Sequence, residues 1–556
     1  MQKKNLLLLS AASMMILSSC SKLGALSSDN FKVDPNPLET TAGQVPATIN
    51  GMFPEKYMKK KATVTVIPEL RYGNGQAVQG TGATFQGEKV QGNNQTISYK
   101  VGGNYSMKTN FKYVPEMQKS ELYLTFDAYI GSKKVDVPAV KVADGIVATS
   151  ELSGRTVKSA QASVAQDAYQ RIIEHKQEAN IKFLIQQATL RKSELKNNSV
   201  KEFVEMLKKI NADKEGLNLK NVEVSAYASP DGGLKLNDKL AAQRQDNTEK
   251  FVNKTLKNTQ VEAPVDAKYT AQDGEGFQEL VKVSDIQDKD VILRVLSMYK
   301  DPEEREQQIK NMSAVFRELA DGILPELRRA RLTLNYEVIG RSDAQIVEQF
   351  GNDASQLSNE ELIYGATLVN DAQKEAFYKK AAELYNDARA YNNLATLAFA
   401  KGDLSAAKNY AQKAQSVDGS NAESNANLGL IALAEGNVRD AENYIAKAAN
   451  AFGLSEIVGN LNLMKGNYAQ AEQDFANINS NSAALAQILN KNYNAATSTL
   501  NNIKNGDATT EYLKAILNAR LGNNSAAATA LKAAISKDSS YAKYAENDLE
   551  LVNVSK

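Results

Sequence analysis

Residues 222–245, VEVSAYASPDGGLKLNDKLAAQRQ, bring together charged and polar side chains that could bind a ligand. Apolar residues alternate up to Ala228, the turn Ser-Pro-Asp-Gly-Gly follows, and an amphipathic run then carries Leu240 and Arg244. This order predicts a strand, a turn and a helix. Because an arginine guanidinium can make a two-point, charge-assisted contact with a carboxylate, a ligand site at the turn is one hypothesis. A turn that only reverses the chain is the other.

Histidine and cysteine chemistry is almost absent from the sequence. His175, in RIIEHKQEAN, is the only histidine and Cys20 is the only cysteine. A metal site or a nucleophilic triad needs several such residues together, so the sequence predicts neither. We expect His175 to be a surface or structural residue on a helix.

Carboxylates and glycines give no stronger indication of catalysis. The pairs Glu303-Glu304 and Glu360-Glu361 lie in charged stretches, without the apolar pocket that acid catalysis needs. The glycines of GNGQAVQGTG lie among strands, with no helix after them to bind a phosphate. We therefore expect a protein that is not an enzyme and needs no cofactor.

The first 20 residues, MQKKNLLLLSAASMMILSSC, have the features of an export signal. Lys3 and Lys4 precede an apolar run that is too short, at about 1.5 Å per residue, to span a bilayer core of about 30 Å. Leu-Ser-Ser-Cys at residues 17–20 resembles the bacterial lipobox, which implies lipidation of Cys20 and a signal peptide over residues 1–20. A plain secretory signal is the alternative.

The location of the mature protein follows from the residues after Cys20. Ser21, in place of an aspartate, resembles lipoproteins sorted to the outer membrane, and SKLGALSSDN lacks the acidic run that some Gram-negative groups use for surface export. We expect the outer membrane and its periplasmic face, and the cell surface is the alternative. The net charge is +1, from 66 basic and 65 acidic residues, so there is no charge excess to attract nucleic acid.

The rest of the chain divides into four regions by composition and period. Residues 21–45 are rich in Ser, Pro, Asn and Thr and predict a tether. Residues 46–150 alternate apolar and polar positions between turn residues, which predicts a β-sandwich of the immunoglobulin-like kind. Residues 155–345 alternate strand and helix patterns and predict an α/β sandwich with a helical insertion. Residues 355–556 have a helical period throughout.

A repeat is visible in this last region. Gly402 and Gly436 are 34 residues apart, and each is followed five residues later by an alanine, Ala407 or Ala441. Glycine suits a tight turn and the small alanine permits close helix packing. Related units follow at Gly466, at Lys491, where a lysine stands in place of the glycine, and at Gly522.

These units resemble tetratricopeptide repeats. Asn393-Leu394-Ala395 and Asn427-Leu428-Gly429 fall where that family has Asn-Leu-Gly. The resemblance implies an all-α solenoid of four to six repeats that binds protein partners on its concave surface, where Asn393 and Asn427 would be polar positions. A generic alanine-rich bundle is the alternative.

Residues 155–345 resemble the OmpA-like peptidoglycan-associating family. Asn237, Leu240 and Arg244 keep its Asn-x-x-Leu-x-x-x-Arg spacing, Gly232 keeps its turn glycine, and RRARLTLNYEV resembles its closing strand. The resemblance implies an α/β sandwich whose turn aspartate and helix arginine pair with the amine and carboxylate of diaminopimelate in peptidoglycan.

The family's aspartate position is occupied by Ser229, and Asp231 lies two residues away. Because serine cannot neutralise an ammonium group, Asp231 would have to take that role. The candidate peptidoglycan-binding residues are therefore Asp231, Arg244, Ser229 and Asn237. The alternative is that Arg244 is solvated or pairs structurally with Asp231.

Together these features predict a lipid-anchored periplasmic scaffold that links the outer membrane to peptidoglycan and recruits protein partners through its repeats. The alternative is an accessory lipoprotein subunit of an outer-membrane secretion, assembly or transport machine, whose OmpA-like domain no longer binds peptidoglycan.

Overall fold

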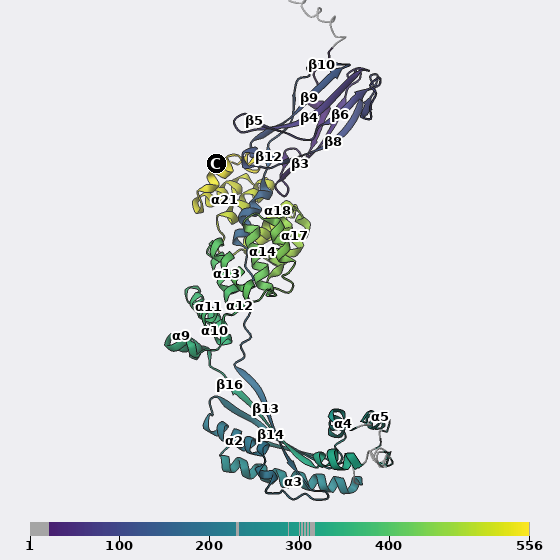
Figure 1. Ribbon diagram of the computed structural model, residues 1–556. Helices are drawn as coiled ribbons and strands as arrows, with labels where there is room; N and C mark the ends of the chain where they lie inside the picture. The colour runs from purple at the N-terminus through teal and green to yellow at the C-terminus, as the bar shows by residue number, and fades with distance from the viewer. Residues whose placement is uncertain are drawn as a thin grey trace, which may run out of the picture. The chain divides into compact units, whose positions relative to one another are not determined.

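The structure is a computed structural model that describes residues 22–229, 233–286, 289–299, 301, 304, 307–308, 311 and 317–554. The chain forms two compact units. One, the discontinuous unit, is drawn from Met1–Asp167 and Val369–Lys556, and the other, the inserted unit, from Ala168–Leu368 (Figure 1). Cys20 and Asp231 lie outside the described residues. Within the described parts, none of the helices combines the length and apolarity needed to cross a bilayer.

The N-terminal part of the discontinuous unit is built from two β-sheets. A three-stranded antiparallel sheet has the order β1-β3-β8, with β1 over Phe31–Asp34, β3 over Gln44–Phe53 and β8 over Gly103–Lys112. The second sheet has the order β10-β9-β4-β6-β7, with β11 also paired to β9 and β5 to β4. Its strands are β4 (Ala62–Tyr72), β5 (Gln76–Gln79), β6 (Ala83–Gly87), β7 (Gln95–Ile97), β9 (Ser120–Ile130), β10 (Lys133–Val135) and β11 (Val140–Asp144).

One apolar core lies between the two sheets. Buried and less buried residues alternate along β4 and β8, as the period of two predicts. Ile49 and Phe53 of the first sheet belong to the same buried cluster as Val64 and Leu122 of the second. The β-rich N-terminal region is therefore confirmed.

The tether expected over residues 21–45 is not observed. Leu23 and Val33 are buried in the core between the sheets, and Leu38 lies in β2 (Leu38–Glu39), which pairs with β12 (Ile146–Val147). The prediction was wrong because polar residues separate the few apolar ones, so that no strand period is visible. Leu23, Val33 and Leu38 nevertheless pack in one buried cluster with strands that lie further along the chain.

The inserted unit contains a four-stranded sheet of order β13-β16-β14-β15. Its strands are β13 (Ile172–Lys182), β14 (Leu217–Tyr227), β15 (Val265–Thr270) and β16 (Arg329–Ile339). β16 is antiparallel to both β13 and β14, whereas β15 is parallel to β14. His175 lies on β13, with its ring centroid 5.7 Å from that of Tyr336. The prediction of a helix at His175 was wrong, because this outer part of the strand is exposed and shows no apolar alternation.

Two long helices cover the sheet of the inserted unit (Figure 1). They are α2 (Asn198–Ala212) and α3 (Leu234–Thr259), and they pack against each other and against the sheet. Phe203 and Val252 share a buried cluster with Val222 and Val224. Shorter helices include α4 (Gly274–Val283), α5 (Lys289–Met298), α8 (Leu324–Leu327), α9 (Asp343–Asp353) and α10 (Asn359–Gly365).

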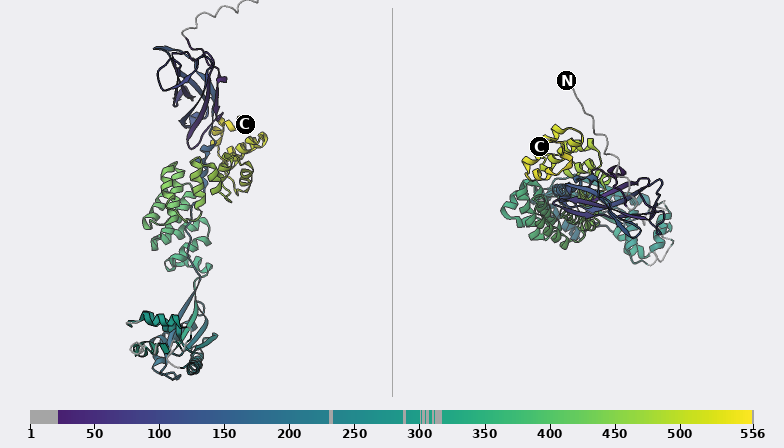
Figure 2. Two further views of the ribbon diagram at one scale, coloured as in Figure 1. Left: turned by 90° about the vertical axis from the view of Figure 1, so that its right-hand side faces the viewer. Right: turned by 90° about the horizontal axis from the view of Figure 1, so that it is seen from above.

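The C-terminal part of the discontinuous unit is an array of paired helices (Figures 1 and 2). After α11 (Asp371–Tyr385) the pairs are α12 (Ala388–Ala400) with α13 (Leu404–Val417), α14 (Ala422–Ala434) with α15 (Val438–Ile445), α16 (Leu454–Met464) with α17 (Tyr468–Asp474), α18 (Asn481–Leu489) with α19 (Tyr493–Asn502), and α20 (Ala508–Arg520) with α21 (Asn524–Lys537). A short helix, α22 (Ser540–Glu546), follows. The helical-repeat region is confirmed, and the starts of α12 and α14 are 34 residues apart.

The turn between the helices of each pair adopts the backbone expected from the sequence. Gly402 has a φ of 77° and Gly436 a φ of 80°, in the left-handed region. Lys491 has a φ of 63°, so the pair without the glycine keeps the same turn. Ala407 and Ala441 are fully buried, as close packing of the two helices requires.

Candidate functional site

The structure brings three of the four predicted peptidoglycan-binding residues together at the end of β14 and the start of α3. Asn237 Nδ2 donates a hydrogen bond of 2.9 Å to the carbonyl oxygen of Ser229. Arg328 Nε lies 3.1 Å from Ser229 Oγ, to which it donates. With Arg244 these residues line a pocket of about 50 Å³. Asp231, the fourth predicted residue, lies outside the described residues.

Arg244 is buried in this pocket, with an exposed fraction of 1%. Its Nε and Nη2 donate to the carbonyl oxygens of Gln187 and Leu184, at 3.0 and 3.3 Å. Its Nη1 donates to the carbonyl oxygen of Tyr227 at 2.8 Å, and the guanidinium carbon lies 5.0 Å from the ring centroid of Phe183. The guanidinium thus ties α3 to β14 and to the segment after β13. A pocket of about 50 Å³ has room for roughly one water molecule.

An ion pair, formed by Arg329 and Asp273, lies beside this pocket. Arg329 Nη2 is 3.3 Å from Asp273 Oδ2, and both side chains are largely buried. Asp273 also caps α4, because its Oδ1 accepts the N–H of Gly276 at 2.9 Å. The sequence analysis assigned no role to Asp273, since a lone aspartate before a glycine reads as an ordinary turn.

The carboxylates of Glu360 and Glu361 have structural partners, whereas Glu303 lies outside the described residues. Glu361 accepts hydrogen bonds from Arg341 Nη1 at 3.0 Å and closes a capping box with Ser358. Glu360 accepts the main-chain N–H of Ala168 at 2.7 Å. Nowhere in the described chain do three or more His, Cys, Asp or Glu side chains gather as a metal site would require.

The most elaborate polar site lies on the first helices of the repeats. The segment that follows β12 runs along them, first as short helical turns over Thr149–Leu152, Ser153–Thr156 and Val157–Ser159 and then as an extended chain over residues 160–167. Leu152 belongs to the buried cluster of α18 and α20, whereas Val157 and Ala160 belong to that of α12 and α14. We call residues 149–167 the linker segment.

Asparagine side chains hold the main chain of the linker segment. Asn427 Oδ1 accepts the N–H of Ser163 at 2.7 Å, and its Nδ2 donates to the carbonyl oxygen of Ser163 at 2.7 Å. Asn393 makes the same pair of bonds to Ala165, at 2.8 and 2.9 Å. Asn392 Nδ2 also donates to the carbonyl oxygen of Ser163, at 3.0 Å. All three asparagines are buried.

The linker segment is also anchored at its beginning. Thr149 Oγ1 donates to Glu550 Oε1 at 2.6 Å, and Glu550 in turn accepts Arg520 Nε at 2.9 Å. Thr156 Oγ1 lies 3.0 Å from Ser482 Oγ on α18. The segment therefore contacts the array from its last helices to its first pair.

Asn393 and Asn427 lie on the surface formed by the first helices of the repeats, but they bind the protein's own main chain there. The expectation that they form an open surface for partners is therefore corrected. No pattern in the sequence indicates this contact, because residues 160–167, AQASVAQD, have neither a strand period nor a motif.

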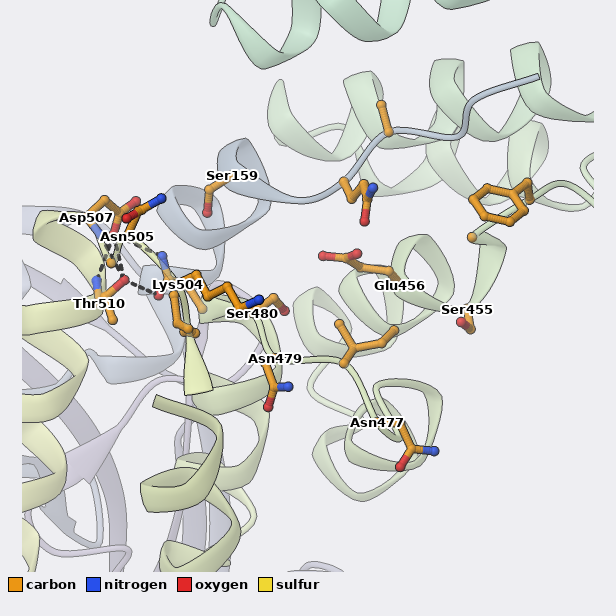
Figure 3. Close-up of a pocket in the computed structure, with 18 residues that line it drawn as sticks. Ser159, Ser455, Glu456, Asn477, Asn479, Ser480, Lys504, Asn505, Asp507 and Thr510 are labelled. Carbon is orange, nitrogen blue, oxygen red and sulfur yellow. Dashed lines mark hydrogen bonds between the residues drawn. The ribbon is translucent and has the colours of Figure 1, made fainter. Parts of the chain in front are cut away.

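A larger pocket adjoins the linker segment (Figure 3). It has a volume of about 710 Å³. Its walls include Ser159, Gln161 and Ala162 of the segment and the loops before α16, α18 and α20, with the polar side chains Glu456, Asn477, Asn479, Lys504 and Asn505. Burial raises the pKa of the Glu456 carboxyl, and the hydrogen bond from the Gln161 main chain opposes this effect.

No protein-family model matches the sequence, and no curated protein matches it. Among solved structures, the chain is similar to a tetratricopeptide repeat protein from Parabacteroides merdae ATCC 43184, with 15% identity and a TM-score of 0.28 over 44% of this chain and 98% of that one. It is also similar to pilF of Pseudomonas aeruginosa, with 19% identity and a TM-score of 0.27 over 35% and 97%. YrrB, a tetratricopeptide repeat protein with an unusual peptide-binding site, gives 19% identity and a TM-score of 0.21 over 37% and 99%. At these TM-scores the helical-repeat assignment rests on the helix pairs of this chain.

Proposed function

We propose that the protein is a scaffold that recruits protein partners through its helical repeats, which are tetratricopeptide repeats. The observation that carries this proposal is the two-point hold of Asn427 and Asn393 on the main chain of Ser163 and Ala165. Side-chain amides that both donate and accept can bind the main-chain N–H and carbonyl of one residue without contacting its side chain. The repeats thus bind extended polypeptide, which at these asparagines is the protein's own linker segment.

In this proposal the scaffold is a lipoprotein of the outer membrane, on its periplasmic face. The support is the lipobox-like Leu-Ser-Ser-Cys ending at Cys20, followed by Ser21. Bacterial lipoproteins carry several acyl chains, and each buried CH₂ contributes about 0.8 kcal/mol to membrane binding. The anchor would hold the scaffold firmly at the membrane.

The inserted unit is, in this proposal, an OmpA-like domain. Two functions remain open for it: a link to peptidoglycan, or a structural module in an accessory subunit of a secretion, assembly or transport machine. The three carbonyl partners of Arg244 favour the second, because the donors of a buried guanidinium that already bind carbonyl groups are costly to redirect to a ligand. Ser229 supplies no negative charge for an ammonium group.

Crosslinking in intact cells, followed by purification of the full-length protein from outer membranes, tests the scaffold. We expect defined proteins to copurify with the wild type. They should be lost from a variant with Ala407→Leu and Ala441→Leu, whose repeats are overpacked. Equal recovery with both proteins, or no copurifying protein with either, would contradict recruitment through the repeats.

A further inference from the structure

Only one edge of the extended linker segment is occupied by the repeats. The main-chain N–H of Gln161 donates to the Glu456 carboxylate. Ser163 and Ala165 each use both their N–H and their carbonyl oxygen in bonds to Asn427 and Asn393. These bonds therefore recur at every second residue.

This spacing determines where the other peptide groups point. In an extended chain the N–H and carbonyl of one residue point to one side, and those of the next residue point to the opposite side. The peptide groups of Ala162, Val164 and Gln166 therefore point away from the asparagines. Within the described chain their main-chain N–H groups have no hydrogen-bond partner, and the Val164 carbonyl has only its neighbour's side-chain amide, Gln166 Nε2, at 3.4 Å.

We propose that this open edge, residues 162–166, is the docking site for an extended segment of a partner protein, which adds to it as a strand. The inference deepens the recruitment function proposed above and rests on it. Donors and acceptors that recur every second residue along an extended edge are matched by another extended main chain. An unpaired edge of this kind is a ready template for such pairing.

The same partner chain would continue into the pocket beside the linker segment. It opens next to Gln161 and Ala162, at one end of the open edge, and its volume of about 710 Å³ accommodates several residues. The side-chain amides of Asn477, Asn479 and Asn505 lie on its walls (Figure 3). They offer the same kind of donor and acceptor as the amides of Asn427 and Asn393, which suits a polypeptide main chain.

Hydrogen exchange of the purified full-length protein tests the edge itself. We expect the amides of Ala162, Val164 and Gln166 to exchange at least tenfold faster than those of Ser163 and Ala165. Equal protection of both sets would mean that the edge is already paired, and the proposal would be overturned.

A proline scan tests the partner. Val164→Pro removes the outward N–H and retains an extended backbone, whereas Val164→Ala changes only the side chain. Each variant carries the photocrosslinker p-benzoylphenylalanine in place of Gln166, an exposed residue, and is crosslinked in cells before purification. Mass spectrometry maps the crosslinked residue in the partner.

We expect Val164→Pro to lower the crosslinked yield about five- to tenfold relative to Val164→Ala, the effect of losing one main-chain hydrogen bond. Unchanged thermal unfolding of Val164→Pro checks that the fold is intact. Partners that crosslink equally to both variants would overturn strand addition and leave recruitment standing. A crosslink to glycan in place of protein would also overturn strand addition. If no protein copurifies with the wild type, recruitment itself would be contradicted as well.

Discussion

Asn427 and Ser163 are joined by two hydrogen bonds across 264 residues of sequence. Asn427 Oδ1 accepts the Ser163 N–H and Asn427 Nδ2 donates to the Ser163 carbonyl, both at 2.7 Å. The amide side chain thereby binds the main-chain N–H and carbonyl of Ser163, as a residue of a neighbouring strand would. Because Ser163 follows the β-rich region and Asn427 belongs to α14, the two parts of the discontinuous unit are held together by this contact.

Loss of the asparagines should loosen the linker segment. In a variant with Asn393→Ala and Asn427→Ala, the N–H of Ser163 and both main-chain groups of Ala165 lose their partners, and the Ser163 carbonyl keeps only Asn392. An unsatisfied buried polar group costs about 1–3 kcal/mol, so we expect a lower midpoint of thermal unfolding and faster proteolysis within residues 160–167. Limited proteolysis with mass spectrometry measures the second effect.

The matched control for this variant is Asn409→Ala, on the exposed side of α13. It should leave both measurements unchanged. A double variant that unfolds and is cleaved like wild type would show that the asparagines do not hold the segment.

The repeats could be predicted because their signal is local. A turn residue and an alanine five positions later recur at Gly402 and Gly436, and the packing that they imply lies within one helix pair. The linker segment could not be predicted, because its partners Asn393 and Asn427 are more than 200 residues away. Leu23 and Val33 were missed for another reason, because the polar residues around them leave no visible strand period.

For the candidate site of the inserted unit, the residues could be predicted but their hydrogen bonds could not. The resemblance to the OmpA-like family placed Ser229, Asn237 and Arg244 at one turn, and the structure places them around one pocket. The path of residues 184–187 determines which carbonyl oxygens accept hydrogen bonds from the Arg244 guanidinium, and no local pattern specifies that path. Local sequence patterns therefore identify the residues of the site but not their hydrogen-bond partners.

Overpacking should distinguish the two faces of a repeat helix. Ala527 and Ala526 are neighbours on α21, the first fully buried and the second exposed. Ala527→Leu should cost about 1–3 kcal/mol because a leucine does not fit the contact, and Ala526→Leu should be almost neutral. Urea unfolding of both variants measures the difference, and equal stability would contradict the packing of this helix pair.

Stability should depend on the ionisation of Glu456. Burial raises its pKa above the ordinary value of 4.5, so the folded state binds the proton more tightly than the unfolded state. The free energy of unfolding should therefore fall as the pH rises from about 4.5 through the raised pKa. Glu456→Gln stays neutral and can still accept the Gln161 N–H, so it should remove this decrease.

The measurement is thermal unfolding between pH 4 and pH 8, with Glu546→Gln, at an exposed position, as the control. Glu456→Gln should gain stability relative to wild type at the upper end of this range. A constant difference between the two proteins at all pH values would rule out the raised pKa.

Lipidation should depend on Cys20. The hydroxyl of serine cannot replace the thiol that receives the lipid, so Cys20→Ser should abolish the incorporation of labelled fatty acid and release the protein from membranes. Ser19→Ala is a matched control that leaves the thiol in place. A Cys20→Ser protein that remains labelled and membrane-bound would disprove the lipoprotein assignment.

Binding to peptidoglycan can be measured by sedimentation with purified sacculi, and stability must be measured beside it. Arg244→Ala removes a buried guanidinium together with its hydrogen bonds to three carbonyl groups, so we expect it to destabilise the inserted unit by about 3 kcal/mol. Loss of pelleting in this variant alone would therefore not identify a ligand contact.

Ser229→Asp is the more informative change, because it restores the carboxylate that the OmpA-like resemblance places at this turn. If the domain has lost its ligand, wild type should pellet weakly and Ser229→Asp should pellet several-fold more. If wild type already binds through Asp231, Asp231→Asn should weaken pelleting more than Ser229→Ala, since only Asp231 supplies charge. Strong binding that survives both Asp231→Asn and Arg244→Ala would place the wall contact elsewhere in the chain. The bonds of Arg244 to main-chain carbonyls lead us to expect the first outcome.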